Sequence, residues 1–286
     1  VNRFEVFPSI HVGYTLPHEQ KLTFAYSYRT NRPELFYMEP YITYRDYYTA
    51  EIGNPDIRPE YIHSYELNYK KNIGEQVLQS SLFYRSRKDK IERLRVPYEA
   101  GVTLDSMANV GNDHALGMEL SGQFIVNKWW NLNVNGNVYY YKVVNNINSG
   151  GKEETSTNYD ITVNNLLRIC KNTRIQLDGN FVGPSVTTQG RSDSFWFVNL
   201  AIRQQWFGSN LQSTLSFRDI FNSARYKNDI TTPNLESVTH IRPKFPVITL
   251  SISYTFNHFK RSSQNSRDNR DLFEGVNHYK SYIYSH

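Results

Sequence analysis

Period-2 alternation of apolar and polar side chains constrains this chain more than any other feature of its sequence. The clearest example begins at Trp130, from which every second residue up to Tyr140 is apolar, aromatic or glycine. The alternate positions are polar: Asn131, Asn133, Asn135 and Asn137. Because successive side chains of a β-strand point to opposite faces, this segment is predicted to be a strand with one apolar and one polar face. A soluble sandwich and an outer-membrane barrel both contain such strands, so alternation alone leaves both folds open.

The same alternation recurs along the chain and predicts an all-β protein. It is clear in residues 21–29, 64–70, 117–124, 175–181, 196–203 and 248–256, and weaker in residues 10–14, 78–85, 159–169 and 211–218. With residues 130–141, these segments predict about eleven strands and no helix of consequence. Many run to roughly 9–12 residues, whereas strands of soluble proteins average about 5–6 and a tilted strand across a bilayer needs about 9–11. Strand length therefore favours the membrane.

The connections between the predicted strands alternate strictly between short and long. Short ones lie at residues 17–20, 71–75, 127–128, 171–173 and 207–210, and long ones at residues 30–60, 86–113, 142–158, 183–193 and 222–244. Outer-membrane barrels have this pattern, with short periplasmic turns and long extracellular loops. Trp129, Trp130, Trp206 and Phe207 cluster at the short-turn end, where an aromatic girdle is expected. The sequence therefore predicts an antiparallel transmembrane β-barrel in the bacterial outer membrane, with long loops extracellular and short turns periplasmic.

Composition agrees with a chain that faces lipid on one side and water on the other. Of 286 residues, 39% are hydrophobic, 21% are charged and 15% are aromatic, which is too aromatic for disorder. The mean hydropathy is −0.61, and no segment approaches the roughly 18 apolar residues of a spanning helix. The net charge of +5 is spread along the chain, which argues against a nucleic-acid partner. A single cysteine, Cys170, excludes an intramolecular disulfide framework.

The odd strand count predicts that the barrel is incomplete in this chain. Single-chain bacterial barrels normally have an even number of strands, and unpaired strand edges are not tolerated in lipid. The chain also begins at Val1, with neither an initiator Met nor a signal peptide. We therefore expect a fragment or processed product that is completed by strands outside this sequence.

Several short segments are typical of one protein family. The most specific are Gly-Asn-Pro-Asp-Ile-Arg-Pro-Glu at residues 53–60, followed by Tyr-Glu-Leu at residues 65–67, and Asp-Ile-Phe-Asn at residues 219–222. Others are residues 28–33, residues 109–111 leading to Gly-Met-Glu-Leu at residues 117–120, and the closing segment, residues 250–256. These segments resemble the C-terminal barrel half of TonB-dependent outer-membrane receptors, particularly the branch with long surface loops.

The resemblance covers about residues 1–256 and implies that they form about strands 12–22 of a 22-stranded barrel. It implies a lumen filled by an N-terminal plug, with TonB acting through the plug. The implied partners are outer-membrane lipid, the plug and remaining barrel strands, a surface lipoprotein lid, and a small-molecule, glycan or peptide solute. Neither plug nor TonB box lies in this chain, and the polar C-terminal tail, residues 257–286, extends past the expected closing strand into the periplasm.

The long connection at residues 31–54 is the first candidate for solute binding. Aromatic rings with polar tips suit stacking on sugars, peptides or planar ligands. The candidate residues are Phe36, Tyr37, Tyr41, Tyr44, Tyr47 and Tyr48. The alternative is a loop that packs on itself over the barrel mouth.

Two other motifs favour structural roles. Residues 53–60 contain turn-forming Gly, Asn and Pro, which predict a rigid passage from loop to strand with Glu60 accepting backbone N–H bonds. Asp219 and Asn222 are expected to satisfy backbone donors where the chain leaves the sheet.

Seven charged residues alternate with the apolar positions and are expected in the lumen, because charge on the lipid face is costly. They are Glu66, Lys70, Arg85, Glu119, Asp178, Arg203 and Arg218. There they dock a plug or line a solute route; the alternative is a hydrated wall with incidental ion pairs.

No pattern in the sequence indicates catalysis, a cofactor or a metal site. The eight histidines are scattered without metal-ligand spacing, and Ser9 with His11 lacks an acidic partner and an oxyanion motif. Three hypotheses follow: a TonB-dependent receptor barrel, a plug-less barrel acting as passive porin, adhesin or assembly scaffold, and a barrel enzyme. A plug upstream in the full gene separates the first two, and the third lacks its catalytic residues.

Overall fold

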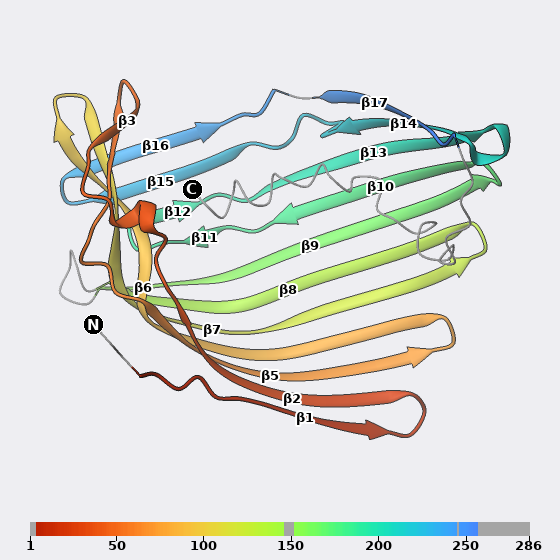
Figure 1. Ribbon diagram of the computed structural model, residues 1–286, viewed down its shortest axis with the longest axis horizontal. Coiled ribbons are helices and arrows are strands. Elements are labelled where there is room, and N and C mark those ends of the chain that lie inside the picture. Colours follow the sequence, from red (N-terminus) through yellow and green to blue (C-terminus); the bar gives the residue numbers. More distant parts are fainter. Residues whose placement is uncertain (1–3, 146–151, 245, 257–286) are drawn as a thin grey trace.

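A computed structural model describes residues 4–145, 152–244 and 246–256 of the chain. The C-terminal tail, residues 257–286, lies outside the described residues. One large antiparallel sheet dominates the molecule, and eleven strands follow one another across it in chain order (Figure 1). They are β1 (Ser9–Leu16), β2 (Gln20–Asn31), β5 (Glu60–Ile73), β6 (Gln76–Glu99), β7 (Val102–Asn127), β8 (Trp130–Asn145), β9 (Lys152–Cys170), β10 (Thr173–Val182), β13 (Phe195–Trp206), β14 (Leu211–Arg218) and β17 (Val247–Tyr254). The prediction of about eleven strands is confirmed, and β1 and β17 form the two edges of this series.

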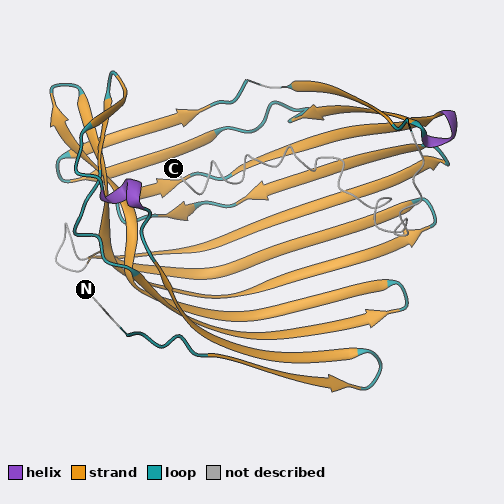
Figure 2. Ribbon diagram, in the orientation of Figure 1, coloured by secondary structure: helices purple, strands orange, loops and turns teal. Residues whose placement is uncertain are grey.

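The long connections contain strands that the sequence did not predict. In the first lie the short 3-10 helix η1 (Leu35–Met38) and the strands β3 (Thr43–Asp46) and β4 (Thr49–Ile52). A separate four-stranded sheet is built by β11 (Ser185–Val186), β12 (Gly190–Ser192), β15 (Tyr226–Thr232) and β16 (Leu235–Ile241). One further 3-10 turn, η2 (Phe207–Ser209), joins β13 to β14 (Figure 2). Among the described residues, no helix is long and apolar enough to cross a membrane.

Short and long connections lie at opposite ends of the strands, as Figure 1 shows with the short turns on the right. The prediction of a long loop at residues 86–113 is wrong, because β6 and β7 continue through it as a paired hairpin that turns only at Ala100 and Gly101. The physical reason is an irregularity in the β6–β7 register between Arg87 and Ile91, where Asp89 has a φ of +55°. Such a bulge shifts the alternation of side chains, so the sequence pattern stops there although the backbone pairing continues.

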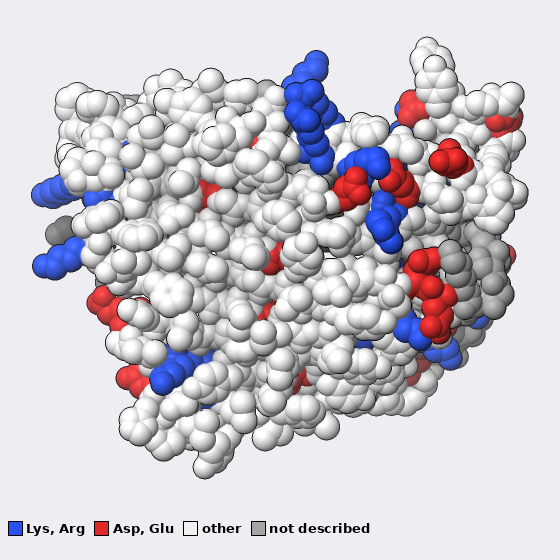
Figure 3. Space-filling view, turned by 180° about the vertical axis from the view of Figure 1, so that it is seen from behind, with Lys and Arg blue, Asp and Glu red and all other residues white. Residues whose placement is uncertain are grey.

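Strand register separates the sheet into an apolar face and a polar face. One row across neighbouring strands contains Val12, Phe24, Leu67, Leu82, Met118 and Val138, and the next row contains Gly13, Thr23, Asn68, Ser81, Glu119 and Asn137. In a soluble sandwich the apolar row would be buried under a second sheet. Here Leu67 is 41% and Leu82 is 52% exposed. The face seen in Figure 3 carries few charged side chains over its middle, and most Lys, Arg, Asp and Glu gather at its two ends.

Close approach of strands on the polar face requires glycine at one position. Gly117 on β7 pairs with Tyr139 on β8, and a Cβ atom at Gly117 would lie 2.3 Å from the Cβ of Tyr139. The aromatic ring of Phe83, beside Gly117 on β6, is only 3% exposed and is covered by the guanidinium of Arg85 at 4.4 Å. The absence of a side chain at Gly117 therefore leaves room for the rings of Phe83 and Tyr139 to pack on the polar face.

Candidate functional site

The long connections build an ordered structure at one end of the sheet. Here β4 pairs in parallel with the first residues of β7, from Thr49 opposite Thr103 to Ile52 opposite Ser106. β3 pairs with β4, and β7 pairs with β6 on its other side. A small sheet in the order β3-β4-β7-β6 therefore extends beyond the central sheet. We call this region, residues 32–59 with residues 91–109 of the β6–β7 hairpin, the cap.

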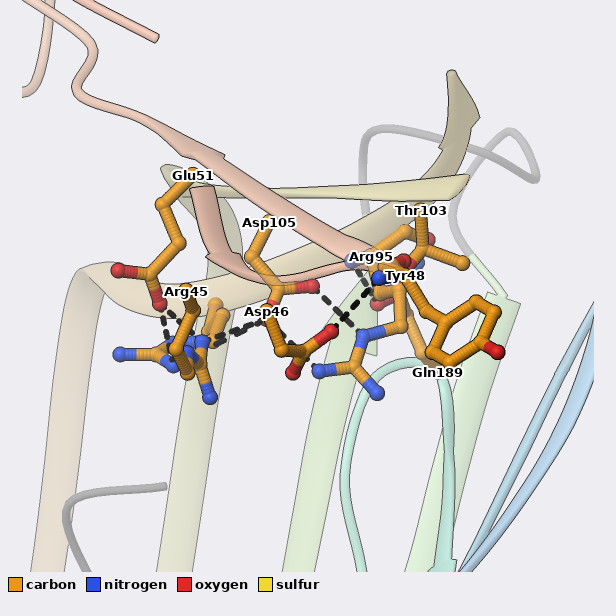
Figure 4. A network of polar contacts seen from close by, with 9 residues as sticks. Arg45, Asp46, Tyr48, Glu51, Arg95, Thr103, Asp105 and Gln189 are labelled. Carbon is orange, nitrogen blue, oxygen red and sulfur yellow. Dashed lines mark hydrogen bonds and ion pairs between the residues drawn. The ribbon is translucent and has the colours of Figure 1, made fainter. Parts of the chain in front are cut away.

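A cluster of charged side chains around the buried Asp105 holds the cap together (Figure 4). Asp105 on β7 is 2% exposed and accepts hydrogen bonds from Arg95 Nε at 2.6 Å and Arg95 Nη2 at 2.7 Å. Arg45 of β3 donates to the same carboxylate at 3.1 Å and also pairs with Glu51 of β4. Arg93 donates to Glu51 at 3.2 Å. The hydrogen bond with Asp105 raises the pKa of Arg95, so its positive charge is fixed.

The connection between β10 and β13 is joined to the cap by paired backbone and amide groups. The N–H of Arg95 donates to Gln189 Oε1 at 2.8 Å, and Gln189 Nε2 donates to the Arg95 carbonyl at 3.1 Å. The neighbouring N–H of Thr188 donates to a Glu92 carboxylate oxygen at 3.1 Å. Two long connections that are far apart in sequence therefore form one hydrogen-bonded unit.

The segment at residues 53–60 is fixed as the sequence predicted. Glu60 is 2% exposed, and its carboxylate accepts from the N–H of Ile91 at 2.7 Å and from Asn31 Nδ2 at 2.7 Å. Asn109 on β7 exchanges two hydrogen bonds with the backbone of Arg58. The prediction that Glu60 accepts a backbone N–H bond is confirmed.

Most of the candidate rings in the 31–54 connection are open to solvent. Phe36, Tyr41, Tyr44, Tyr47 and Tyr48 are all exposed, from 58% for Phe36 to 92% for Tyr47, whereas Tyr37 is half-buried with its ring 5.9 Å from that of Phe36. The nearby Glu99 carboxylate raises the pKa of Tyr44, so its hydroxyl stays protonated. A fixed backbone thus carries exposed aromatic side chains.

A small cavity lies within the cap. Its volume is about 50 Å³, and Phe36, Tyr37, Tyr41, Arg93 and Asp105 contribute to its wall. This volume holds a few water molecules rather than a solute. Any larger ligand of the cap would therefore contact its exposed surface.

The seven charged residues expected in the lumen all fall on the polar face by strand register. Arg85 lies between two carboxylates, 3.8 Å from Glu66 and 3.5 Å from Glu119. Asp178 accepts from Gln176 Nε2 at 2.8 Å. A groove of about 480 Å³ runs over this face, and Lys70 and Glu119 contribute to its lining. The structure therefore places these residues on a common surface, and their role there stays a prediction.

The Asp-Ile-Phe-Asn segment ends β14 in the manner that the sequence predicted. Asp219 is 1% exposed, and its carboxylate accepts from the N–H of Ser223 at 2.9 Å and the N–H of Ala224 at 2.9 Å. Both Asp219 and Asn222 have positive φ, +46° and +51°. The prediction for Asp219 is confirmed, since its side chain satisfies backbone donors where the chain turns away from the sheet.

Sequence reasoning missed the Asp105 cluster altogether. Its members come from three segments, residues 45–51, 93–95 and 105, and each looks like an ordinary surface charge in the sequence. The β6–β7 hairpin places Arg95 opposite Asp105, and the parallel pairing of β4 with β7 brings Glu51 and Arg45 to them. Within the described ranges, no three His, Cys, Asp or Glu side chains are grouped so as to hold a metal ion.

The exposed apolar face, the polar face behind it and the separation of short and long connections define an outer-membrane β-barrel. The family model described as "Outer membrane protein beta-barrel family" matches residues 1–254. The chain belongs to this family, and the resemblance and fold class stated from the sequence are confirmed.

Solved structures agree with this fold. The siderophore receptor PirA from Pseudomonas aeruginosa is 14% identical, with a TM-score of 0.57 over 76% of this chain and 39% of its own. The ferric yersiniabactin uptake receptor FyuA from Yersinia pestis is 15% identical, with a TM-score of 0.53 over 85% of this chain and 36% of its own. The copper transporter OprC is 10% identical, with a TM-score of 0.56 over 81% of this chain and 38% of its own.

The chain therefore spans between 36% and 39% of the length of these three proteins. They are receptors and a transporter, and at this identity the likeness shows the fold alone. A search of curated protein sequences finds no match to the chain.

Proposed function

We propose that this chain forms the wall and surface loops of a TonB-dependent outer-membrane receptor that binds and imports a solute. The observation that carries the proposal is the cap, in which the Asp105 cluster fixes the backbone while five aromatic rings remain exposed. Rings held on a rigid support bind a ligand with little loss of conformational entropy. The fold shared with siderophore receptors and a copper transporter supports the same conclusion.

In this proposal the long connections are extracellular and the short turns are periplasmic. Phe36, Tyr37, Tyr41, Tyr44, Tyr47 and Tyr48 meet the solute first, with or without a surface lipoprotein lid above them. The charged residues of the polar face, including Glu66, Arg203 and Arg218, dock a plug domain of the full-length protein. TonB acts on that plug, and the chain catalyses no reaction.

The test is a structure of the full-length protein extracted from outer membranes in detergent. We expect a closed barrel of about 22 strands with a folded domain in the lumen that contacts Glu66, Arg203 or Arg218, and solute density beside the cap aromatics. An open lumen, or a closed barrel of about 12 strands, would contradict the receptor proposal and leave a passive porin, adhesin or assembly scaffold.

A functional measurement complements the structure. Uptake through a TonB-dependent receptor requires energy from the inner membrane, whereas passive flow through a porin does not. Passage of the solute identified by that density across the outer membrane, measured as its accumulation in the periplasm, should therefore stop when the proton-motive force is dissipated. Replacing Tyr41, Tyr44 and Tyr47 by Ala should weaken binding of that solute. A Phe207→Ala variant serves as the control, because this exposed ring lies at the short-turn end of the sheet, away from the cap.

A further inference from the structure

The apolar face ends in a repeated Tyr–His arrangement at the long-connection end of the sheet. The hydroxyl of Tyr26 on β2 lies 3.1 Å from Nδ1 of His63 on β5, and the hydroxyl of Tyr84 on β6 lies 3.0 Å from Nδ1 of His114 on β7. Tyr65 connects the two pairs, with its ring centroid 4.9 Å from that of Tyr26 and 6.1 Å from that of Tyr84. The same hydrogen bond is thus made twice along one edge of the apolar face.

Strand register shows that the two histidines flank a small residue. His63 pairs with Ser86 on β6, and Ser86 pairs with His114 on β7. The imidazoles are therefore about 10 Å apart, two strand spacings, with only a serine side chain between them. Lys88 follows Ser86 on the same face and pairs with Tyr61 of β5. We call His63, Ser86, Lys88 and His114 the rim notch.

The rim notch presents nitrogen atoms for a ligand outside the chain. In both histidines Nδ1 faces a tyrosine hydroxyl, and within the described part of the chain Nε2 of neither ring has a hydrogen bond. The His63 ring is held parallel to Tyr28 with centroids 4.5 Å apart, so its orientation is fixed. Lys88 is exposed, and no carboxylate of the described residues forms an ion pair with it. Positive and hydrogen-bonding groups therefore gather around one small side chain.

Distance along β8 places the rim notch at the level of lipid headgroups. Trp130 and Tyr140 are both on the apolar face, and ten residues of strand span about 34 Å. With a strand tilt of about 40°, this becomes about 26 Å across the membrane, close to the roughly 25 Å apolar band of outer-membrane barrels. Tyr65, Tyr84 and Tyr140 then form the girdle at one boundary, and the row of His63, Ser86 and His114 lies one step beyond it.

We propose that the rim notch binds a phosphate group of the phosphorylated glycolipid in the outer leaflet. A phosphate over Ser86 would meet His63 and His114 on either side and Lys88 above, while acyl chains cover the apolar rows below. Phosphate oxygens are strong acceptors for such donors. The proposal rests on the proposed orientation, in which the long connections are extracellular.

The test is native mass spectrometry of the full-length protein with added lipid A, which counts lipid molecules retained on the folded barrel. The double variant His63→Phe with His114→Phe keeps the ring packing but removes both imidazoles, and Lys88→Gln removes the charge. We expect about tenfold weaker retention of lipid A in each, the size of one charge-assisted hydrogen bond. The control, His11→Phe, changes a histidine on the polar face and should retain lipid A like the wild type.

Three outcomes would overturn the proposal. They are equal retention by the double variant and wild type, equal retention by Lys88→Gln and wild type, or equal retention of lipid A and of enzymatically dephosphorylated lipid A. Folding of each variant is checked by its shift on gels before and after heating. Orientation is tested separately through Cys170, so failure of the rim notch leaves the receptor proposal untouched.

Discussion

Asp105 and Asp219 are both almost inaccessible to solvent, yet they stabilise different parts of the chain. Asp105 joins β7 to arginines of β3 and β6, whereas Asp219 accepts from backbone N–H groups only four and five residues further on. Removing each carboxylate should therefore have a different effect, long-range in one case and local in the other.

Asp105→Asn should loosen the cap without unfolding the barrel. The substitution removes the one carboxylate that lies within 4 Å of all three guanidiniums, those of Arg45, Arg93 and Arg95. Breaking a buried pair costs about 3–5 kcal/mol, and partial exposure of the arginines reduces this to roughly 1–3 kcal/mol. Limited proteolysis of the folded full-length protein should cut residues 31–54 about tenfold faster. The control is Asp193→Asn, an exposed acid 3.6 Å from Lys227, which should leave cleavage unchanged.

Asp219→Ala should destabilise the turn after β14, while Asn222→Gly should not. The alanine variant leaves the half-buried N–H of Ser223 and the buried N–H of Ala224 without this acceptor, at a cost of about 1–3 kcal/mol. Asn222 has a φ of +51°, which glycine adopts freely. Urea unfolding of both variants in the same detergent measures the difference, and equal midpoints would argue against this role of Asp219.

At the scale of single elements, the β7–β8 pair depends on Gly117. Gly117→Ala would place a Cβ 2.3 Å from Tyr139 Cβ and 2.4 Å from the Val138 carbonyl oxygen, so the strands must separate. We expect a loss of about 1–3 kcal/mol and a lower yield of folded barrel on heat-shift gels. Gly179→Ala on β10 is the matched control, because its Cβ would meet nothing within 4 Å.

The eleven central strands could be predicted because each alternates within itself. Period-2 pattern is a local property, and residues 130–141 or 248–256 show it without knowledge of their neighbours. The distal halves of β6 and β7 could not be predicted in this way, because the irregularity near Asp89 changes the side-chain phase. The aromatic candidates were visible as composition, whereas the Asp105 cluster depends on the distal β6–β7 pairing and on the pairing of β4 with β7, which no local pattern encodes.

At the scale of the whole molecule, the two faces of the sheet should respond oppositely to added charge. Leu82→Arg puts a guanidinium on the apolar face, one row inside the row of Tyr65, Tyr84 and Tyr140. The cost there lies between the roughly 0–1 kcal/mol of the interface and the roughly 2–4 kcal/mol of the midplane. Ser81→Arg, one residue away, puts the guanidinium on the polar face opposite Glu119 and should cost little. Folding into lipid vesicles followed by urea titration compares them, and equal destabilisation would contradict the assignment of faces.

Orientation in the membrane can be read from Cys170, at the short turn between β9 and β10. In full-length protein with any other cysteines replaced, an impermeant maleimide should label Cys170 only after the outer membrane is permeabilised. Labelling of intact cells would contradict the proposed orientation.

The hydrogen bond with the Thr173 hydroxyl lowers the pKa of the Cys170 thiol, so more thiolate is present at neutral pH. Thr173→Val should therefore slow labelling at pH 7 and leave it unchanged well above the thiol pKa.

The length of the β6–β7 hairpin has a consequence for what the protein meets in the cell. Beyond the tyrosine girdle, β6 continues from Lys88 to Glu99, which at about 3.3 Å per residue adds roughly 35 Å of strand. In the proposed orientation, this raises Tyr98 and the attached β3–β4 hairpin through the crowded sugar layer that coats the cell. A solute would then be captured at the outer limit of that layer, before it has to diffuse between the glycolipid chains.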